Sequence, residues 1–299
     1  MNDPAISTRN LTKHFGGKCA LDQLSVDIPR GGIHAIVGSN GAGKSTLFRL
    51  LLGLAEPSGG SSRVLGCDSL QLTADLRGRI GFVNEEHTLP EWMTVGAVKA
   101  MQQQLYPQWQ EAIYREVLGS FDVQAAQKVS ELSRGERAGF NLSLALAQSP
   151  ELLILDEPTL GLDIVAKRAF LEALMFVGAD NGGTIIYCSH QMEEIERVAD
   201  NLLIMEHGAL SAMSPPDEFR QRVGYWIVDF PEYQPTNAEI PGLLQARRID
   251  DQYHLMVLDA DEKLQRYLRE RGASVYSQQP VSLDQAINGY LAKNHRVAQ

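Results

Sequence analysis

The stretch that decides the fold is Gly38-Ser39-Asn40-Gly41-Ala42-Gly43-Lys44-Ser45-Thr46. It fits the phosphate-binding pattern G-x-x-x-x-G-K-[ST]; the apolar run 33–37 before it and the helical pattern 47–53 after it supply the strand and helix that such a loop requires. The glycines let backbone N–H groups turn toward one point, Lys44 reaches the outer phosphates of a nucleotide, and Ser45 offers a hydroxyl to magnesium. A glycine-rich turn with an incidental lysine is the alternative, and the two flanking elements argue against it.

Two carboxylates follow the apolar run 152–155, which is typical of a buried parallel strand. Ligands bind at the carboxyl edge of open parallel sheets, so we expect Asp156 to hold magnesium through water and Glu157 to take a proton from an attacking water. His190 follows the next apolar run, 184–188, and at the same edge it can reach the terminal phosphate. A polar loop after a strand and a structural histidine are the alternatives at these positions.

The composition is that of a globular protein with a large core, since 44% of the 299 residues are hydrophobic and 21% are charged. The formal net charge of -10 disfavours nucleic acid or an anionic lipid surface as the main partner. Cys19, Cys67 and Cys188 are far apart and form no C-x-x-C pair, which suits reduced thiols better than disulfides or zinc. The N-terminus lacks a signal-peptide pattern and no run approaches about 20 apolar residues, so we expect any membrane role to go through a partner.

The rest of the chain predicts further elements around this core. Residues 5–32 have the pattern of a small antiparallel sheet, in which Phe15 either stacks on a purine or belongs to the core. Residues 91–129 have helical periodicity and are expected to form a helical subdomain. A long apolar helix follows residues 132–136, and Ser133 is expected to cap its N-terminal N–H groups.

The last part of the chain predicts a small α+β domain. Its expected elements are strands at 243–249, 253–258 and 273–277 and helices at 261–271 and 282–292. This region contains no phosphate loop, no cluster of metal ligands and no nucleophile beside a base, so it has no phosphoryl-transfer chemistry to contribute. A packing or dimer-supporting role is the first interpretation, and a regulatory, ligand-sensing role is the alternative.

Five motifs resemble, in their order, the nucleotide-binding subunit of ABC transporters over about residues 5–222. They are the phosphate loop, residues 132–136, residues 155–157, residues 160–163 and His190. The resemblance implies an α/β fold: a P-loop NTPase core with a mixed sheet and flanking helices, an N-terminal antiparallel β subdomain and a helical subdomain, followed by the small α+β domain. The expected domains are 1–222 for ATP binding, with the helical subdomain at about 86–150, and 223–299 as an accessory domain.

The resemblance implies ATP hydrolysis by a head-to-tail dimer. Each of two ATP molecules is then held between the phosphate loop of one subunit and the signature, residues 132–136, of the other. Phe15 stacks on adenine in this picture, Ser133 and Gly135 contact the terminal phosphate across the dimer, and Asp163 joins the two sites. A helix N-terminus capped by a small residue is an anion site whichever chain the anion belongs to, which agrees with this role for the signature.

The same resemblance implies ATP and Mg2+ as cofactors, and a role for His190 in fixing the transition-state geometry. The implied partners are a second nucleotide-binding subunit and a separate transmembrane permease, which places the chain in the cytoplasm at the inner face of the cell membrane. Residues 80–86 and 105–109 look most like the ATPases of ABC-2-type bacterial exporters.

Two positions depart from the commonest pattern of the family. Glu85 stands where many members have a glutamine; a carboxylate cannot donate the hydrogen bond of the amide, but it can ligate magnesium or orient water. The signature reads Leu-Ser-Arg-Gly-Glu instead of Leu-Ser-Gly-Gly-Gln, which puts Arg134 beside the phosphate position and Glu136 in the first turn. The alternatives to a transporter subunit are a soluble ABC ATPase of translation or DNA repair and a regulatory nucleotide-binding protein with weak turnover.

We expect residues 85–110 to receive the permease, because they join Glu85 to the helical subdomain and carry Trp92, Tyr106 and Trp109. Aromatic residues at these spacings belong either to an interface or to the core of the subdomain. The two possibilities predict different effects of substitution on stability.

Overall fold

The computed structural model describes residues 3–229, 240–260 and 262–292. The chain divides into two compact units, Met1–Met213 and Ser214–Gln299. The helix expected at 261–271 begins on residue 261, which lies outside the described residues. None of the described helices combines the length and the apolar character that crossing a lipid bilayer requires.

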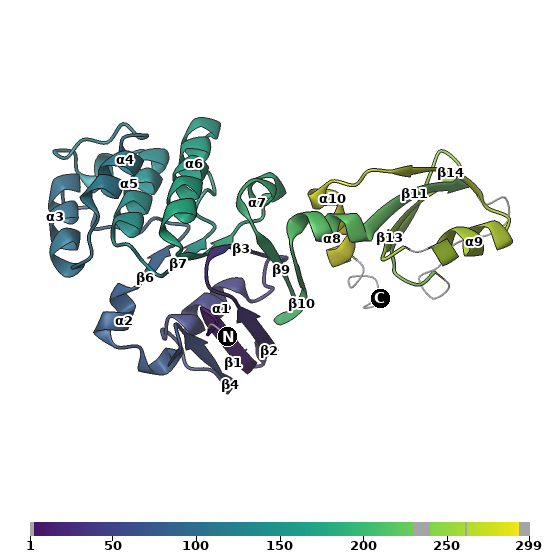
Figure 1. Ribbon diagram of the computed structural model, residues 1–299, viewed down its shortest axis with the longest axis horizontal. Helices are drawn as coiled ribbons and strands as arrows, with labels where there is room; N and C mark the ends of the chain where they lie inside the picture. The colour runs from purple at the N-terminus through teal and green to yellow at the C-terminus, as the bar shows by residue number, and fades with distance from the viewer. Residues whose placement is uncertain (1–2, 230–239, 261, 293–299) are drawn as a thin grey trace. The chain divides into compact units, whose positions relative to one another are not determined.

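A six-stranded sheet with the order β10-β9-β3-β8-β7-β6 forms the centre of the first unit (Figure 1). Its strands are β3 (Gly32–Val37), β6 (Ile80–Val83), β7 (Leu152–Asp156), β8 (Thr184–Cys188), β9 (Asn201–Glu206) and β10 (Ala209–Ser214). β3 is parallel to β8 and β9, and β7 is parallel to β6 and β8, so the carboxyl ends of these five strands lie at one edge. β3, β7 and β8 are buried along nearly their whole length, as expected for central strands covered on both faces.

A second, antiparallel sheet of the first unit has the order β2-β1-β4-β5. Its strands are β1 (Ile6–Phe15), β2 (Lys18–Ile28), β4 (Gly59–Val64) and β5 (Cys67–Asp68). The helix α1 (Lys44–Leu51) buries its apolar side chains in one cluster with Leu24 of β2 and Ile186 of β8. The helix that begins at the phosphate loop therefore packs between the two sheets. In Figure 1 its label, α1, stands close to β1 and β4.

The remaining helices of the first unit include a separate helical subdomain. They are α2 (Ala74–Gly78), α3 (Val95–Leu105), α4 (Glu111–Leu118), α5 (Arg134–Ala147), α6 (Ile164–Asn181) and α7 (Met192–Val198), with short 3-10 turns at Ser69–Gln71 and Val129–Glu131. Helices α3, α4 and α5 share a core of their own that contains Val98, Tyr114 and Phe140. This core confirms the helical region expected between residues 91 and 129.

The aromatic residues expected near the permease divide between surface and core. Trp92 is 80% exposed. Trp109 is half-buried against the core of the helical subdomain; its Nε1 donates to Glu111 Oε2 at 3.1 Å and its ring centroid lies 5.5 Å from that of Tyr114. Trp109 is therefore a packing residue, Tyr106 is half-buried, and Trp92 is presented to solvent.

The second unit contains a four-stranded sheet with the order β12-β13-β11-β14, in which each neighbouring pair is antiparallel. Its elements are α8 (Pro216–Arg222), β11 (Val223–Asp229), β12 (Leu243–Ile249), β13 (Gln252–Leu258), α9 (Glu262–Glu270), β14 (Ser274–Gln279) and α10 (Leu283–Ala292). Trp226 and Leu255 share one face of the sheet and pack with Leu264 of α9. Phe219 of α8 packs edge-on against Tyr290 of α10, with ring centroids 5.4 Å apart, so α8 belongs to this unit.

The expected fold class is confirmed in each of its parts. The first unit combines a mixed sheet with flanking helices, an N-terminal antiparallel sheet and a helical subdomain, and the second unit is α+β. The phosphate loop leaves β3 at the edge where β7 and β8 also end, which positions the residues described next.

Candidate active site

The phosphate loop joins β3 to α1, and at two of its positions other backbone atoms leave no room for a side chain. Gly43, the residue before α1, has φ 100°, and a Cβ there would lie 2.4 Å from the carbonyl oxygen of Ala20. A Cβ on Gly38 would lie 2.3 Å from the carbonyl oxygen of Met205. Because Gly43 caps α1 without a side-chain hydrogen bond, the N–H groups of the first helical turn remain available to an anion.

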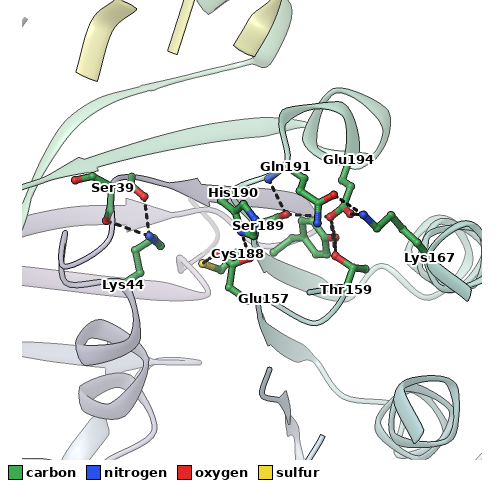
Figure 2. A network of polar contacts seen from close by, with 12 residues as sticks. Ser39, Lys44, Glu157, Thr159, Lys167, Cys188, Ser189, His190, Gln191 and Glu194 are labelled. Carbon is green, nitrogen blue, oxygen red and sulfur yellow. Dashed lines mark hydrogen bonds and ion pairs between the residues drawn. The ribbon is translucent and has the colours of Figure 1, made fainter. Parts of the chain in front are cut away.

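Lys44 lies over this loop. Its Nζ donates to the carbonyl oxygens of Gly38 at 2.7 Å and of Ser39 at 3.3 Å (Figure 2). Both partners are neutral, so these contacts hold the ammonium in place without compensating its charge. The loop therefore presents a fixed cation together with free N–H donors, which is the combination that a phosphate chain requires.

One cleft joins the phosphate loop to the carboxylates at the strand ends. The residues that line it are Phe15, Lys18, Ala20, Asn40, Gly41, Ala42, Gly43, Lys44, Ser45, Thr46, Glu85, Asp156 and Glu157. Phe15 is 50% exposed, and Lys13 Nζ lies 5.0 Å from its ring centroid, so the ring is on the surface and not in the core. A flat aromatic face at a phosphate-binding cleft can stack on a purine. The structure thus brings together most of the residues that the sequence predicts for nucleotide and metal binding.

The ends of β7 and β8 place a carboxylate next to a histidine. Asp156 pairs with Cys188 across the two strands, so the residues that follow them meet. The Nδ1–H of His190 donates to Glu157 Oε2 at 2.8 Å (Figure 2). Glu157 has φ 50°, an uncommon conformation for a side-chain-bearing residue, and its N–H donates to the carbonyl oxygen of Cys188 at 3.0 Å. The carboxylate is thus held at the strand ends within reach of the cleft, where a general base has to lie.

Cys188 is the thiol at this edge. Burial raises the pKa of Cys188 well above its ordinary value, and the charges of Asp156 and Glu157 raise it further. The thiol stays protonated at neutral pH, so it acts here as a small apolar side chain and not as a nucleophile.

The oxygen atoms in the cleft fit a magnesium ion that is shared with a nucleotide. Ser45, Glu85 and Asp156 all line the cleft, and hydroxyl and carboxylate oxygens are the ligands that Mg2+ prefers. Among the described residues, no group of three or more His, Cys, Asp and Glu side chains could hold a metal ion. Mg2+ commonly binds through one or two carboxylates together with substrate phosphates, so this sparse set is the one expected for a magnesium–nucleotide complex.

The signature residues lie elsewhere on the same unit. Among the described residues, those that line the cleft do not include Ser133, Gly135 or Asp163. Ser133 caps α5 as expected: its Oγ accepts from the N–H of Glu136 at 3.3 Å, and the Glu136 carboxylate accepts from the N–H of Ser133 at 2.7 Å. The N-terminus of α5 is therefore ordered before any ligand or partner arrives.

Asp163 caps the neighbouring helix α6, since its Oδ1 accepts from the N–H groups of Val165 and Ala166, each at 2.9 Å. A Cβ on Gly135 would lie 2.8 Å from the Cβ of Ala166, so the N-termini of α5 and α6 are in contact. Ile164 and Val165 next to Asp163 are 85% and 79% exposed. An apolar, exposed surface thus adjoins the signature.

Sequence reasoning missed two buried polar residues beside the site. His87 is 1% exposed and its Nε2 donates to the carbonyl oxygen of Pro158 at 2.9 Å. Glu194 of α7 is 3% exposed and accepts hydrogen bonds from three hydroxyl groups. Glu194 stands four residues before the buried Val198, so helical periodicity offered a signal that it faces the core. We find no comparable signal for His87.

The fold and the cleft together define a P-loop nucleotide-binding protein. Comparison with known proteins is more specific: the family described as ABC transporter matches residues 21–160. The chain is 34% identical over 236 residues to Nod factor export ATP-binding protein I of Rhizobium sp. (strain N33), covering 77% of each chain. It is 30% identical over 287 residues to the protein of the same name from Burkholderia lata, covering 93% of this chain and 94% of the relative.

A solved structure described as the ATP-binding subunit of an ABC transporter aligns with a TM-score of 0.65 and 26% identity, over 73% of this chain and 92% of that one. The chain belongs to the ABC transporter family, as an ATP-binding subunit. It binds and hydrolyses ATP as part of a transporter, and the relatives named above are exporter subunits. ATP-binding subunits of this family dimerise and work with transmembrane permeases.

Proposed function

We propose that this chain powers an ABC-2-type exporter through ATP-driven closure of a head-to-tail dimer. The observation that carries the proposal is the separation of two anion-binding features in one unit. The phosphate loop lies in the cleft, whereas the capped N-terminus of α5, with Ser133 and Gly135, is not part of its lining. A second copy turned head to tail would bring its α5 N-terminus to this cleft, and the exposed Ile164 and Val165 would be covered.

Within each closed site the residues of this chain take distinct roles. Lys44 and the loop N–H groups bind the outer phosphates, and Phe15 stacks on the adenine. Glu157 takes the proton from the attacking water, while His190 holds the carboxylate through the 2.8 Å contact and helps fix the geometry around the terminal phosphate. Asp163 joins the two sites across the dimer.

Ser45, Asp156 and Glu85 would hold Mg2+, Asp156 doing so through water. When bound, the ion neutralises developing charge on the phosphates. Glu85 supplies a carboxylate where an amide is commoner in the family, and such a side chain either ligates the metal or orients water.

The partner that receives the mechanical work is a transmembrane permease, which holds this chain at the inner face of the cell membrane. Residues 85–110 are the proposed contact surface, because this segment begins at Glu85 in the cleft and presents the exposed Trp92. Closure of the two ATP-binding subunits would then move this segment and the permease with it. The names of the relatives, which describe export, favour an exporter over the other transport directions.

Mixed dimers test the head-to-tail arrangement. Lys44→Ala disables the phosphate loop and Ser133→Arg blocks the signature, so each homodimer contains two damaged sites. A random mixture should recover about a quarter of the wild-type sites, because half of the dimers are mixed and each has one intact site. The control mixes Lys44→Ala with the double variant Lys44→Ala/Ser133→Arg, in which no dimer has an intact site. ATPase activity no higher than this control would refute the arrangement.

A further inference from the structure

A buried carboxylate lies behind the candidate catalytic pair. Glu194 Oε2 accepts from Tyr187 OH at 2.6 Å, from Thr159 Oγ1 at 2.8 Å and from Ser189 Oγ at 2.9 Å (Figure 2). Burying a carboxylate is unfavourable unless hydrogen bonds and a counter-charge compensate the lost water. Three hydroxyl donors on one oxygen atom are the first part of that compensation.

The counter-charge comes from α6. Lys167 Nζ lies 3.2 Å from Glu194 Oε1 and also donates to the side-chain oxygen of Gln191. Lys167 stands four residues after Asp163, and its N–H donates to the Asp163 carbonyl oxygen at 3.0 Å. The Glu194 carboxylate thus forms an ion pair with a residue near the N-terminus of α6, the helix that Asp163 caps.

The partners of Glu194 come from the turns that carry Glu157 and His190. Thr159 stands two residues after Glu157, and Ser189 immediately precedes His190. Ser189 Oγ also accepts from the N–H of Gln191 at 3.1 Å, so the residues on both sides of His190 are anchored. One carboxylate therefore holds both turns whose side chains meet in the 2.8 Å contact between His190 and Glu157.

The directions of these hydrogen bonds depend on the charge of Glu194. Burial raises the pKa of Tyr187 well above its ordinary value, and the neighbouring Glu194 raises it further, so the phenol keeps its proton and donates. A carboxylate accepts on both of its oxygen atoms, whereas an amide of the same shape has one oxygen atom and one NH2 group. In either orientation that NH2 group would face donors, which are the three hydroxyl groups or the Lys167 ammonium.

We propose that Glu194 is a positioning residue for ATP hydrolysis: it does not touch the nucleotide, and its carboxylate fixes the two turns that set His190 against Glu157. The inference rests on the proposed function, because it assumes that Glu157 is the general base. It goes beyond that function by assigning the alignment of the catalytic pair to a residue of α7 outside the cleft. Small errors in such alignment are costly to the rate while leaving substrate binding nearly unaffected.

The test is Glu194→Gln in the full chain, with kcat and the Kd for ATP measured well below the melting temperature of every variant. We expect kcat to fall about tenfold or more, with Kd within about twofold of the wild type. Tyr187→Phe, which keeps the ring and removes one of the three hydroxyls, should lower kcat about threefold with the same Kd. If Glu194→Gln does not fold, Tyr187→Phe decides the question, and an unchanged kcat in that variant would overturn the proposal.

Glu111→Gln is the matched control. Glu111 also accepts from several donors, with contacts to Lys99 Nζ, Trp109 Nε1 and Arg115 Nε, but it lies in the helical subdomain. Its substitution should lower stability and leave the kcat of the isolated chain within about twofold of the wild type. An equal loss of kcat in both variants, or a folded Glu194→Gln with normal kcat, would overturn the assignment. An active Glu157→Gln would instead refute the proposed function.

Discussion

The Nε2 of His87 lies 2.9 Å from the carbonyl oxygen of Pro158 and joins two turns that belong to different strands. His87 follows β6 and Pro158 follows β7, and these strands are paired in parallel up to Val83 and Leu155. This hydrogen bond therefore links the turn that contains Glu85 to the turn that contains Glu157. Because a carbonyl can only accept, the Nε2 carries the proton.

His87 should make the stability of the first unit depend on pH. Burial, together with the nearby charges of Arg134 and Arg137, lowers the pKa of His87 from its ordinary value of 6.5 to about 4. Above pH 6.5 the ring is neutral in both the folded and the unfolded chain and adds no pH dependence. As the pH falls from 6.5 toward 4, the unfolded chain binds a proton that the folded chain does not, which lowers stability by roughly 3 kcal/mol.

Urea unfolding of the wild type and of His87→Gln between pH 7 and pH 4 measures this contribution. Glutamine cannot take up the proton, so the stability advantage of the wild type should shrink by roughly 3 kcal/mol over this range. His34, whose pKa burial also lowers, is common to both chains and cancels in the difference. A difference that stays constant with pH would contradict the prediction.

Glu157→Gln should separate ATP binding from hydrolysis. The substitution keeps the side-chain shape and the backbone conformation at φ 50°, but the amide cannot take a proton from water. We expect phosphate release to fall at least about 100-fold while ATP still binds. An ATP-dependent dimer should then be visible by light scattering. Glu86→Gln, an exposed neighbour of Glu85 outside the lining of the cleft, is the control, and near wild-type turnover in Glu157→Gln would refute the assignment.

Trp92 and Trp109 should respond differently to replacement by alanine. Trp92 is 80% exposed, so Trp92→Ala should change the free energy of unfolding by less than about 0.5 kcal/mol. Trp109→Ala removes the packing on Tyr114 and the bond to Glu111, and should cost about 2 kcal/mol or more.

Only Trp92→Ala therefore reports on the permease. We expect it to hydrolyse ATP alone and to lose co-purification with the membrane subunit, whereas Leu54→Ala, which alters another exposed apolar residue, should not. Normal co-purification of Trp92→Ala would place the contact surface elsewhere.

Truncation of the second unit should leave the ATP site assembled. The cut belongs after Met213, because a chain that ends at Arg222 retains Phe219, which is 1% exposed, without the Tyr290 on which it packs. We expect the affinity for ATP, read by titration, to change less than about twofold, and nucleotide-free association, read by sedimentation, to weaken. Loss of ATP binding in a folded, truncated chain would show that the second unit shapes the site, and an unchanged dimer would favour a sensory role.

Much of the fold and the cleft could be predicted because their signals are local in the sequence. The phosphate loop needs glycine at Gly43 for its backbone conformation, and the apolar run of β7 places Asp156 and Glu157 at the sheet edge. The capping box of Ser133 and Glu136 follows from their spacing in the same way. Such patterns depend on neighbours along the chain, which the sequence displays directly.

The buried polar contacts could not be predicted because they join segments far apart in the chain. Glu194 and its partner Thr159 are 35 residues apart, and His87 and Pro158 are 71 residues apart. For the same reason, the sequence does not decide whether Trp109 is in the core or on the surface, since its burial depends on how α4 packs on α5. The relative placement of turns at the ends of parallel strands, rather than local propensity, decides these contacts.

The position of Cys19 gives the protein a built-in labelling site. Cys19 is exposed and stands between Lys18 and Ala20, both of which line the nucleotide cleft, whereas Cys67 is half-buried and Cys188 is buried. Maleimide dyes react with accessible thiolates, and burial raises the pKa of Cys188, so an environment-sensitive fluorophore will attach preferentially at Cys19. The natural sequence can therefore carry an optical reporter on β2, the strand that supplies Lys18 and Ala20 to the cleft, without any engineered cysteine.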